Sequence, residues 1–277
     1  MKIFSFFLIL TTNLVWSQEI APSILKYTAN NKGKFFVFWG GNRENFTKSD
    51  IRFWGANYDF TIKDVVADDR PKGWHIDYIN PTRMTIPQTN FRFGYFFSQH
   101  YNISIGVDHM KYVMRQFQTV NMSGTIASNL GFDGLYNNQA TALTEDFLTF
   151  EHTDGLNYIN TEIARVDDIS GIFRLSNTDK FQINLTEGVG VGLLFPKTNT
   201  MLMGQDRHDE FHISGFGLAA KAGLQFLVFK HYFVQTELKG GYINMSDIRT
   251  TYNSTDKASQ SFMFLERIVA FGGMWRF

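Results

Sequence analysis

The residues whose types and spacing come nearest to a catalytic arrangement are His212 and Ser214, separated by Ile213. A histidine and a serine can act as general base and nucleophile when a carboxylate orients the imidazole. Asp247 and Glu210 are the carboxylates available for this role. The more ordinary interpretation is that both side chains form hydrogen bonds at a polar rim. We therefore assign no catalytic residue and keep this pair as an alternative.

A second group of candidates lies within residues 42–88, where aromatic and charged side chains are interspersed. Exposed tryptophans among charges suit a recognition surface. Carboxylates can coordinate Ca²⁺, but the spacing of Asp64, Asp68, Asp69 and Asp77 fits no known calcium loop, so we predict no metal site. The candidate binding residues are Trp54, Trp74, Asp64, Asp68 and Asp69.

A third group consists of charged and amide side chains at alternate positions of otherwise apolar segments. Since the side-chain period of a strand is two, these residues face one side of a sheet and their apolar neighbours face the other. Four cations against three carboxylates is close to balance, which predicts an ion-paired interior. The members are Arg92, Asp108, Lys221, Gln225, Gln235, Glu237, Lys239, Glu266 and Arg276. Glu187 has the opposite, outward parity, which predicts a bulge nearby.

The elements that position these groups are alternating segments of membrane-spanning length. A tilted transmembrane strand needs roughly 9–11 residues, and eight segments cover or exceed most of that length. They are about 34–41, 89–97, 102–113, 158–175, 180–195, 213–228, 231–244 and 261–277. Tight connections at 98–100, 176–179 and 229–230 alternate with long ones at 42–88 and 114–157, which we expect to be external loops. Residues 58–65 also alternate, and we place them as a hairpin arm within the first loop.

Composition separates an exported membrane protein from a soluble one. Residues 1–17 have the pattern of a cleavable signal peptide, and 18–33 follow as a periplasmic lead-in. The chain has no cysteine, a formal net charge of zero, and 29 Phe against 5 Pro. The neutral charge excludes a nucleic-acid partner, and no later run approaches the roughly 18 apolar residues of a membrane helix. Residues 34–277 are thus predicted to form an eight-stranded antiparallel up-and-down transmembrane β-barrel, with a soluble β-sandwich as the alternative.

The signal peptide, the strand parity, the aromatic bands and the terminal Phe277 together resemble the small outer-membrane β-barrel proteins of Gram-negative bacteria, the OmpA-like and OmpX-like porin-family group. This resemblance implies an outer-membrane location, contact with outer-membrane lipid and lipopolysaccharide, and insertion by the barrel-assembly machinery. The strand carrying Phe271, Trp275 and Phe277 is the one that resembles the insertion strand. The group includes adhesins, anchors, enzymes and accessory subunits, so it implies no activity.

The functional expectation is a non-enzymatic surface protein whose loops bind a surface or membrane protein partner or a glycan, or serve a structural or accessory role, without a cofactor. One alternative is a lipid A-modifying hydrolase, because His212 and Ser214 resemble the His-x-Ser pair of outer-membrane lipid A deacylases. Gly215 stands where that family has Asn, and neither candidate carboxylate matches its acid position. Another alternative is a narrow channel, but an eight-stranded barrel is just wide enough for side chains to fill.

Overall fold

The computed structural model describes residues 30–71, 88–175, 177–205, 208 and 210–277, and these residues form one antiparallel β-sheet. Within these ranges, no helix has the length and apolar character needed to cross a membrane. A short 3₁₀ turn at Ser170–Phe173 joins two strands. The strands are β1 Phe35–Phe46, β2 Ser49–Gly55, β3 Tyr58–Val65, β4 Ala67–Asp68, β5 Thr89–Phe96, β6 Tyr101–Met114, β7 Thr119–Ile126, β8 Gly134–Ala142, β9 Leu148–Asp168, β10 Phe181–Leu194, β11 Asn199–Leu202, β12 Gly215–Val228, β13 Tyr232–Arg249 and β14 Lys257–Trp275.

The sheet closes into a barrel. The pairing order runs β1, β5, β6, β9, β10, β12, β13 and β14, and β14 pairs with β1 to complete the ring. These ring strands correspond to the segments predicted from alternation, so the all-β barrel class is confirmed. The predicted strand count is wrong for the sheet as a whole, which has fourteen strands. The further strands arise from residues that we expected to be loops.

Strand tilt follows from the register. Stepping from Phe35 across each successive pair leads through Tyr95, Ile103, Ile163, Val189, Ala220, Gly240 and Leu265 to Asn45 on the same strand. One circuit of the barrel thus advances ten residues along β1. Over eight strands, this offset corresponds to a tilt of about 40–45° from the barrel axis.

Alternation sorts the side chains of the barrel strands between its two faces. On β14, Phe264, Glu266 and Ile268 are buried inside, while Leu265 and Val269 are exposed outside. Similar exposed apolar side chains recur around the ring, including Phe91, Phe93, Ile103, Ile105, Ile163, Val189, Val191, Leu193, Phe216 and Leu218. Phe271 and Phe277 are exposed as well, and Trp275 stacks edge-on against Tyr232. The barrel exterior is therefore an apolar band.

Glu187 corrects one expectation about this exterior. The β10 register is unbroken across Glu187, which pairs with Arg165 on β9 and Ala222 on β12, so the predicted bulge is absent. The side chain is exposed on the outer face. Its cross-strand neighbour Arg165 carries the opposite charge, which makes an outward carboxylate tolerable there.

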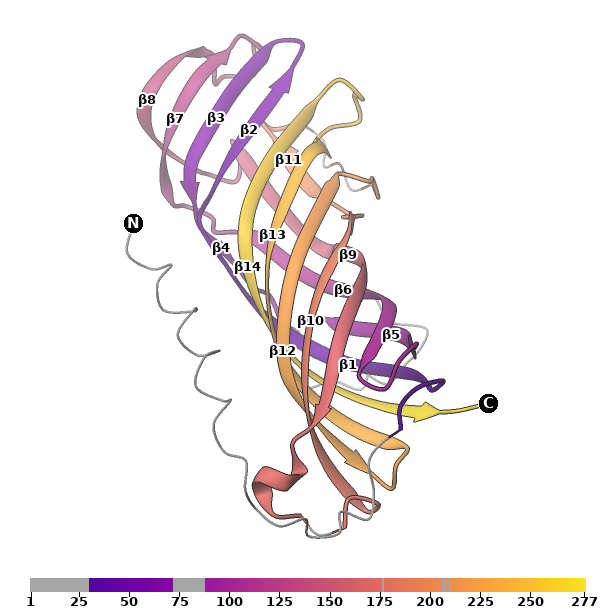
Figure 1. Cartoon of the computed structure of the whole chain (residues 1–277). Helices are drawn as coiled ribbons and strands as arrows, with labels where there is room; N and C mark the ends of the chain where they lie inside the picture. Colours follow the sequence, from indigo (N-terminus) through magenta and orange to yellow (C-terminus); the bar gives the residue numbers. More distant parts are fainter. Residues whose placement is uncertain (1–29, 72–87, 176, 206–207, 209) are drawn as a thin grey trace.

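A folded extension replaces the long loops predicted at 42–88 and 114–157. Residues 257–260 of β14 pair with 51–54 of β2, and β3, β7 and β8 continue the sheet from there. Figure 1 shows these four strands standing beyond one end of the barrel. The β2–β3 hairpin includes the arm that we predicted at 58–65. We call β2, β3, β7 and β8, with β4, β11 and the adjoining outer ends of β6 and β9, the outer extension.

The interior is layered along the barrel axis. The outer extension shares an apolar core with the upper barrel, built around Phe53, Phe60, Tyr112, Phe150 and Phe262. A second apolar cluster, which we call the lower plug, fills the opposite end with Phe36, Phe38, Phe96, Val166, Leu227, Phe233, Ile268, Ala270 and Met274. Charged side chains occupy the lumen between the two. The polar groups of this barrel are therefore enclosed above and below by packed hydrocarbon.

Candidate functional site: charged lumen and outer cavity

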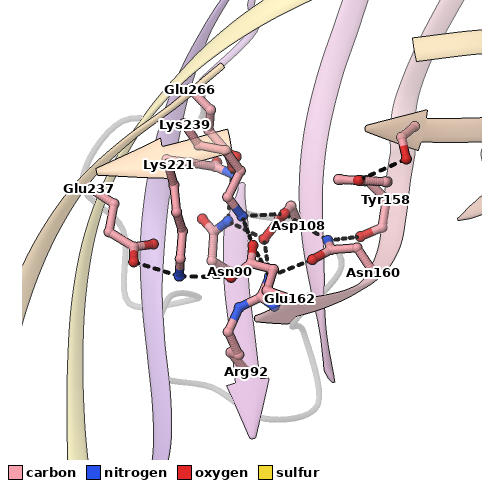
Figure 2. Close-up of polar contacts among 12 residues, drawn as sticks. Asn90, Arg92, Asp108, Tyr158, Asn160, Glu162, Lys221, Glu237, Lys239 and Glu266 are labelled. Carbon is pink, nitrogen blue, oxygen red and sulfur yellow. Dashed lines mark hydrogen bonds and ion pairs between the residues drawn. The ribbon is translucent and has the colours of Figure 1, made fainter. Parts of the chain in front are cut away.

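The centre of the lumen is an ion-pair network with Glu162 of β9 at its middle. Lys239 Nζ lies 2.8 Å from Glu162 Oε1 and 2.7 Å from Asp108 Oδ2. Lys221 Nζ lies 2.7 Å from Glu162 Oε2 and 2.7 Å from Glu237 Oε1. Figure 2 shows these side chains converging from different strands of the ring. Two predicted cations, Lys221 and Lys239, thus meet at Glu162, a carboxylate absent from the predicted set, and each also contacts a predicted carboxylate.

Arg92 completes the network from β5. Its guanidinium lies 3.0 Å from Glu162 and 3.4 Å from Asp108, and it donates a 2.8 Å hydrogen bond to Asn160 Oδ1. Arg92 is only 1% exposed, so these contacts take the place of water. A buried charge is tolerated when it is paired and hydrogen-bonded in this way.

Amide side chains extend the network toward the lower plug. Gln225 donates a 2.9 Å hydrogen bond to Gln235, and Gln235 donates a 2.7 Å bond to Glu237. Arg276 does not join them, because it is exposed and donates to the carbonyls of Asn30 and Lys32. The parity that assigned Arg276 to the lumen fails because β14 ends at Trp275.

Carboxylates outnumber cations in the buried lumen, contrary to the predicted near-balance. Glu266 accepts hydrogen bonds of 2.7 Å from Asn42 and 2.8 Å from Asn90, and Glu44 accepts one from Gln88. No ion pair to Glu44 or Glu266 is found in the described part of the chain. In the upper part of the lumen, the carboxylates are therefore stabilised by hydrogen bonds from amide side chains rather than by cations.

The lumen below the network is occluded. A cavity of about 20 Å³ lies among Phe36, Phe38, Phe96, Lys221 and Glu237. That volume holds about one water molecule. A hydrated ion does not fit in this cavity.

A larger cavity, of about 580 Å³, lies at the base of the outer extension, and we call it the outer cavity. An ion pair of 2.7 Å joins Arg115 to Asp68 beside it, and one of 3.1 Å joins Arg70 to Glu151. Hydrogen bonds from Arg115 hold the pKa of Asp68 below its usual range. The walls of the outer cavity are formed by Asp68, Asp69, Arg70, Val113, Met114, Arg115, Gln116, Glu145, Thr149, Phe150, Glu151, Asn199 and Met201. Pockets of this volume accommodate small ligands.

The predicted loop residues separate into two places. Asp68 and Asp69 line the outer cavity, while Trp54 lies on β2 beneath the guanidinium of Arg52, 5.4 Å from the ring centre. Asp64 is exposed on β3, and its backbone N–H donates to Asp50. Trp74 lies outside the described residues, as do the predicted signal peptide 1–17 and most of the lead-in 18–33. No group of three or more metal-ligating side chains gathers in the described segments.

The candidate catalytic pair is not assembled. His212 Nε2 lies 2.9 Å from Asp247 Oδ2, so one predicted carboxylate does orient the imidazole. Ser214, however, is 1% exposed and donates a 3.3 Å hydrogen bond to the carbonyl of His212 rather than to its ring. Ser214 precedes β12, which begins at Gly215, so strand alternation does not direct its side chain outward. Ser214 therefore does not contact the imidazole that would act as its base.

The burial of His152 predicts a pH-dependent stability of the outer extension. It lies above the apolar band, hydrogen-bonded to Thr198 at 2.9 Å, and burial lowers its pKa from 6.5 to about 3. The folded state therefore binds fewer protons than the unfolded state between these values. We expect the opening free energy of the extension to be constant above pH 6.5 on this account and to fall below it by about 1.4 kcal/mol per pH unit.

Amide hydrogen exchange of β9 and β11 at pH 7.0, 6.0 and 5.0 measures this slope. A His152→Asn variant is the control, and its slope should be smaller by the contribution of one proton. Equal slopes in the two proteins would contradict the assignment to His152.

Comparisons with known proteins return structures alone. No protein-family model and no curated protein matches the chain. It is similar to the outer-membrane protein OprG from Pseudomonas aeruginosa (10% identity, TM-score 0.38, covering 90% of this chain and 99% of that one). It is also similar to the attachment invasion locus protein Ail of Yersinia pestis (11% identity, TM-score 0.31, 86% and 99% covered) and to Neisserial surface protein A (8% identity, TM-score 0.29, 85% and 96% covered). These neighbours are small Gram-negative outer-membrane β-barrels, as the resemblance seen in the sequence implied.

Proposed function

We propose that this chain is an integral outer-membrane protein in which a sealed, non-conducting barrel anchors a folded outer extension that binds a ligand at the cell surface. The observation that carries the proposal is the inversion of polarity across the barrel wall. The exterior is apolar, whereas the interior holds paired charges. A protein surrounded by water would not expose such a band; a barrel surrounded by lipid requires it.

The orientation follows from the connections. Tight turns after Phe96 and Val228 lie at the end of the barrel where β1 begins and β14 finishes. Outer-membrane barrels keep short turns in the periplasm and their long segments outside. The outer extension then faces the exterior, together with the outer cavity.

The outer cavity supports a binding role for the extension. Its walls combine paired arginines and carboxylates with the apolar side chains of Met114, Phe150 and Met201. This combination fits a saccharide-sized ligand, which offers hydroxyl groups along its edges and an apolar face. The hydrolase alternative has no comparable support, because Ser214 is buried away from the imidazole of His212.

The test of surface display uses the absence of cysteine from the chain. We expect Asn137→Cys, at an exposed position of β8, to react with a membrane-impermeant maleimide on intact cells. Ser98→Cys, in the tight turn between β5 and β6, is the matched control and should react after the outer membrane is permeabilised. Reaction of both positions, or of Ser98→Cys alone, on intact cells would refute the proposed placement.

A second arm tests the sealed lumen. Purified protein inserted in a planar bilayer should carry no steady current, because the lower plug and the ion-pair network leave no continuous water path. A variant with Phe36, Phe96 and Phe233 all replaced by Ala, which removes much of the lower plug, is the comparison. Stepwise conductance of the unaltered protein would favour the channel alternative.

A further inference from the structure

Two arginines stand side by side on the outer face of the seam that closes the barrel. Arg43 of β1 and Arg267 of β14 are direct partners in the register of this strand pair. Their chain neighbours Glu44 and Glu266 are buried in the lumen, so alternation directs both guanidinium groups outward. Arg267 is exposed and Arg43 is half-buried. The seam thus presents two positive charges toward the surroundings of the barrel.

Their level is within the outer half of the apolar band. Both positions lie eight residues along the strands from the Phe35–Trp275 pair at the periplasmic end. At about 3.3 Å per residue and the tilt of the barrel, this distance is about 19 Å along the axis. Leu265 and Val269, the exposed residues that flank Arg267 on β14, are apolar. Arg267 extends across the seam to Asn45 Oδ1, at 2.9 Å, two residues further outward on β1.

The charges of these arginines are not neutralised within the described chain. Neither forms an ion pair there, and Arg43 donates instead to the carbonyl of Asn42, at 2.6 Å. Lys48, exposed beyond the outer end of β1, also forms none. By contrast, the outward Arg165 is paired and lies 2.6 Å from Asp167. Like charges on adjacent strands repel, and an ionisable side chain in an apolar band marks a functional site with a missing partner.

We propose that Arg43 and Arg267, with Lys48 above them, bind a phosphate group of lipid A in the outer leaflet. The inference rests on the proposed outer-membrane placement. A guanidinium group forms bidentate, charge-assisted hydrogen bonds to phosphate. Two guanidinium groups on neighbouring strands would bind the same phosphate. Lipid A is the phosphorylated glycolipid of that leaflet, and its acyl chains would run toward the membrane centre along the exposed apolar side chains of Val269 and Phe271. The anion relieves the repulsion that the bare seam carries.

Native mass spectrometry of the full protein in detergent micelles, titrated with bisphosphorylated lipid A, tests this site. We expect the double variant Arg43→Gln/Arg267→Gln to bind lipid A about ten- to thirtyfold more weakly than the unaltered protein. Lipid A stripped of its phosphates should bind the unaltered protein as weakly. Arg165→Gln/Arg174→Gln, which removes the same charge toward the periplasmic end, is the control and should retain binding.

Each other outcome overturns the site. Unchanged affinity of the double variant would assign the two arginines to simple contact with interfacial water. If the protein bound phosphatidylglycerol as tightly as lipid A, the site would be one for anionic lipids in general and not for lipid A. Because the substituted side chains face outward, we expect each variant to fold. Heat-dependent electrophoretic mobility verifies that it does. If lipid A binding does not depend on the two arginines but Asn137→Cys is still labelled on intact cells, only the lipid site is refuted. If Asn137→Cys is not labelled, the outer-membrane placement itself is refuted.

Discussion

Replacing Lys239 by Met is expected to destabilise the barrel by about 3–5 kcal/mol, because two buried carboxylates lose one of the two cations they share and keep only Arg92 in common. Lys239 is 1% exposed and contacts both Asp108 and Glu162 within 2.8 Å. Met fills a similar volume, so the loss measures charge rather than packing. Urea-induced unfolding in lipid vesicles, followed by tryptophan fluorescence, gives the free energy of unfolding.

Glu266→Gln is the matched control within the same lumen. Glu266 is fully buried but accepts its hydrogen bonds from Asn42 and Asn90 rather than from a cation. A glutamine oxygen can accept the same bonds, so we expect a change within about 1 kcal/mol or a gain in stability. If Lys239→Met changed the free energy of unfolding as little as Glu266→Gln, the ion-pair network would not be what stabilises the barrel interior.

The second large effect is expected from Phe60→Ala in the outer extension, with a loss of about 3–5 kcal/mol. Phe60 is 1% exposed and packs against Phe53 and Phe147, with ring centres 5.3 Å and 5.8 Å away. Removing the ring leaves a cavity between β3 and the chain that leads into β9. The loss should fall on the extension, because the barrel strands hold their own continuous ladder.

Limited proteolysis of the variant in vesicles measures where the loss falls. Cleavage within 47–67 and 117–147 should accelerate, while a protected barrel core with heat-dependent mobility persists. Leu135→Ala is the control, since Leu135 is 79% exposed on β8 and should change neither property. Loss of the barrel together with the extension in Phe60→Ala would refute their separate stability.

The ring of the barrel could be predicted from the sequence because each of its strands has one face in hydrocarbon. Ile103 and Ile105 alternate with Asn102 and Ser104, and this period survives without any tertiary information. Lumen residues followed from the same parity, and the structure places Arg92, Asp108, Lys221, Gln235, Glu237, Lys239 and Glu266 inside. Glu162 carries the same signal, between the outward Thr161 and Ile163, and could have been selected by it.

The outer extension could not be predicted in full, because its strands have weaker alternation. On β7, the inward position between Met122 and Ile126 is Gly124, which has no side chain to mark the period. β8 is polar on both faces and largely exposed, so it has no period to detect. Burial of β7 depends on contacts with β3, which is more than fifty residues away in sequence. Such long-range pairing is what a local pattern does not contain.

The candidate sites failed where a side chain lay at the end of an element. Ser214 precedes β12 and turns inward, and Arg276 follows β14 and leaves the lumen. Side chains alternate between the two faces only within a continuous strand, so this rule does not apply to residues beyond its ends. The outer cavity was also missed as a unit, because its walls come from β4, β6, β9 and β11 and from the connecting residues beside them, which only the folded sheet brings together.

The position of β14 in the sheet has a consequence for biogenesis. Its outer residues 257–260 pair with β2, and the rest of the strand pairs with β1 and β13. Every other strand of the sheet leaves the ribosome before this one. Until β14 pairs, neither closure of the cylinder nor attachment of the extension is possible, so β1, β2 and β13 each keep an unpaired edge. One strand completes both, and a chain shortened before Lys257 would keep an open sheet.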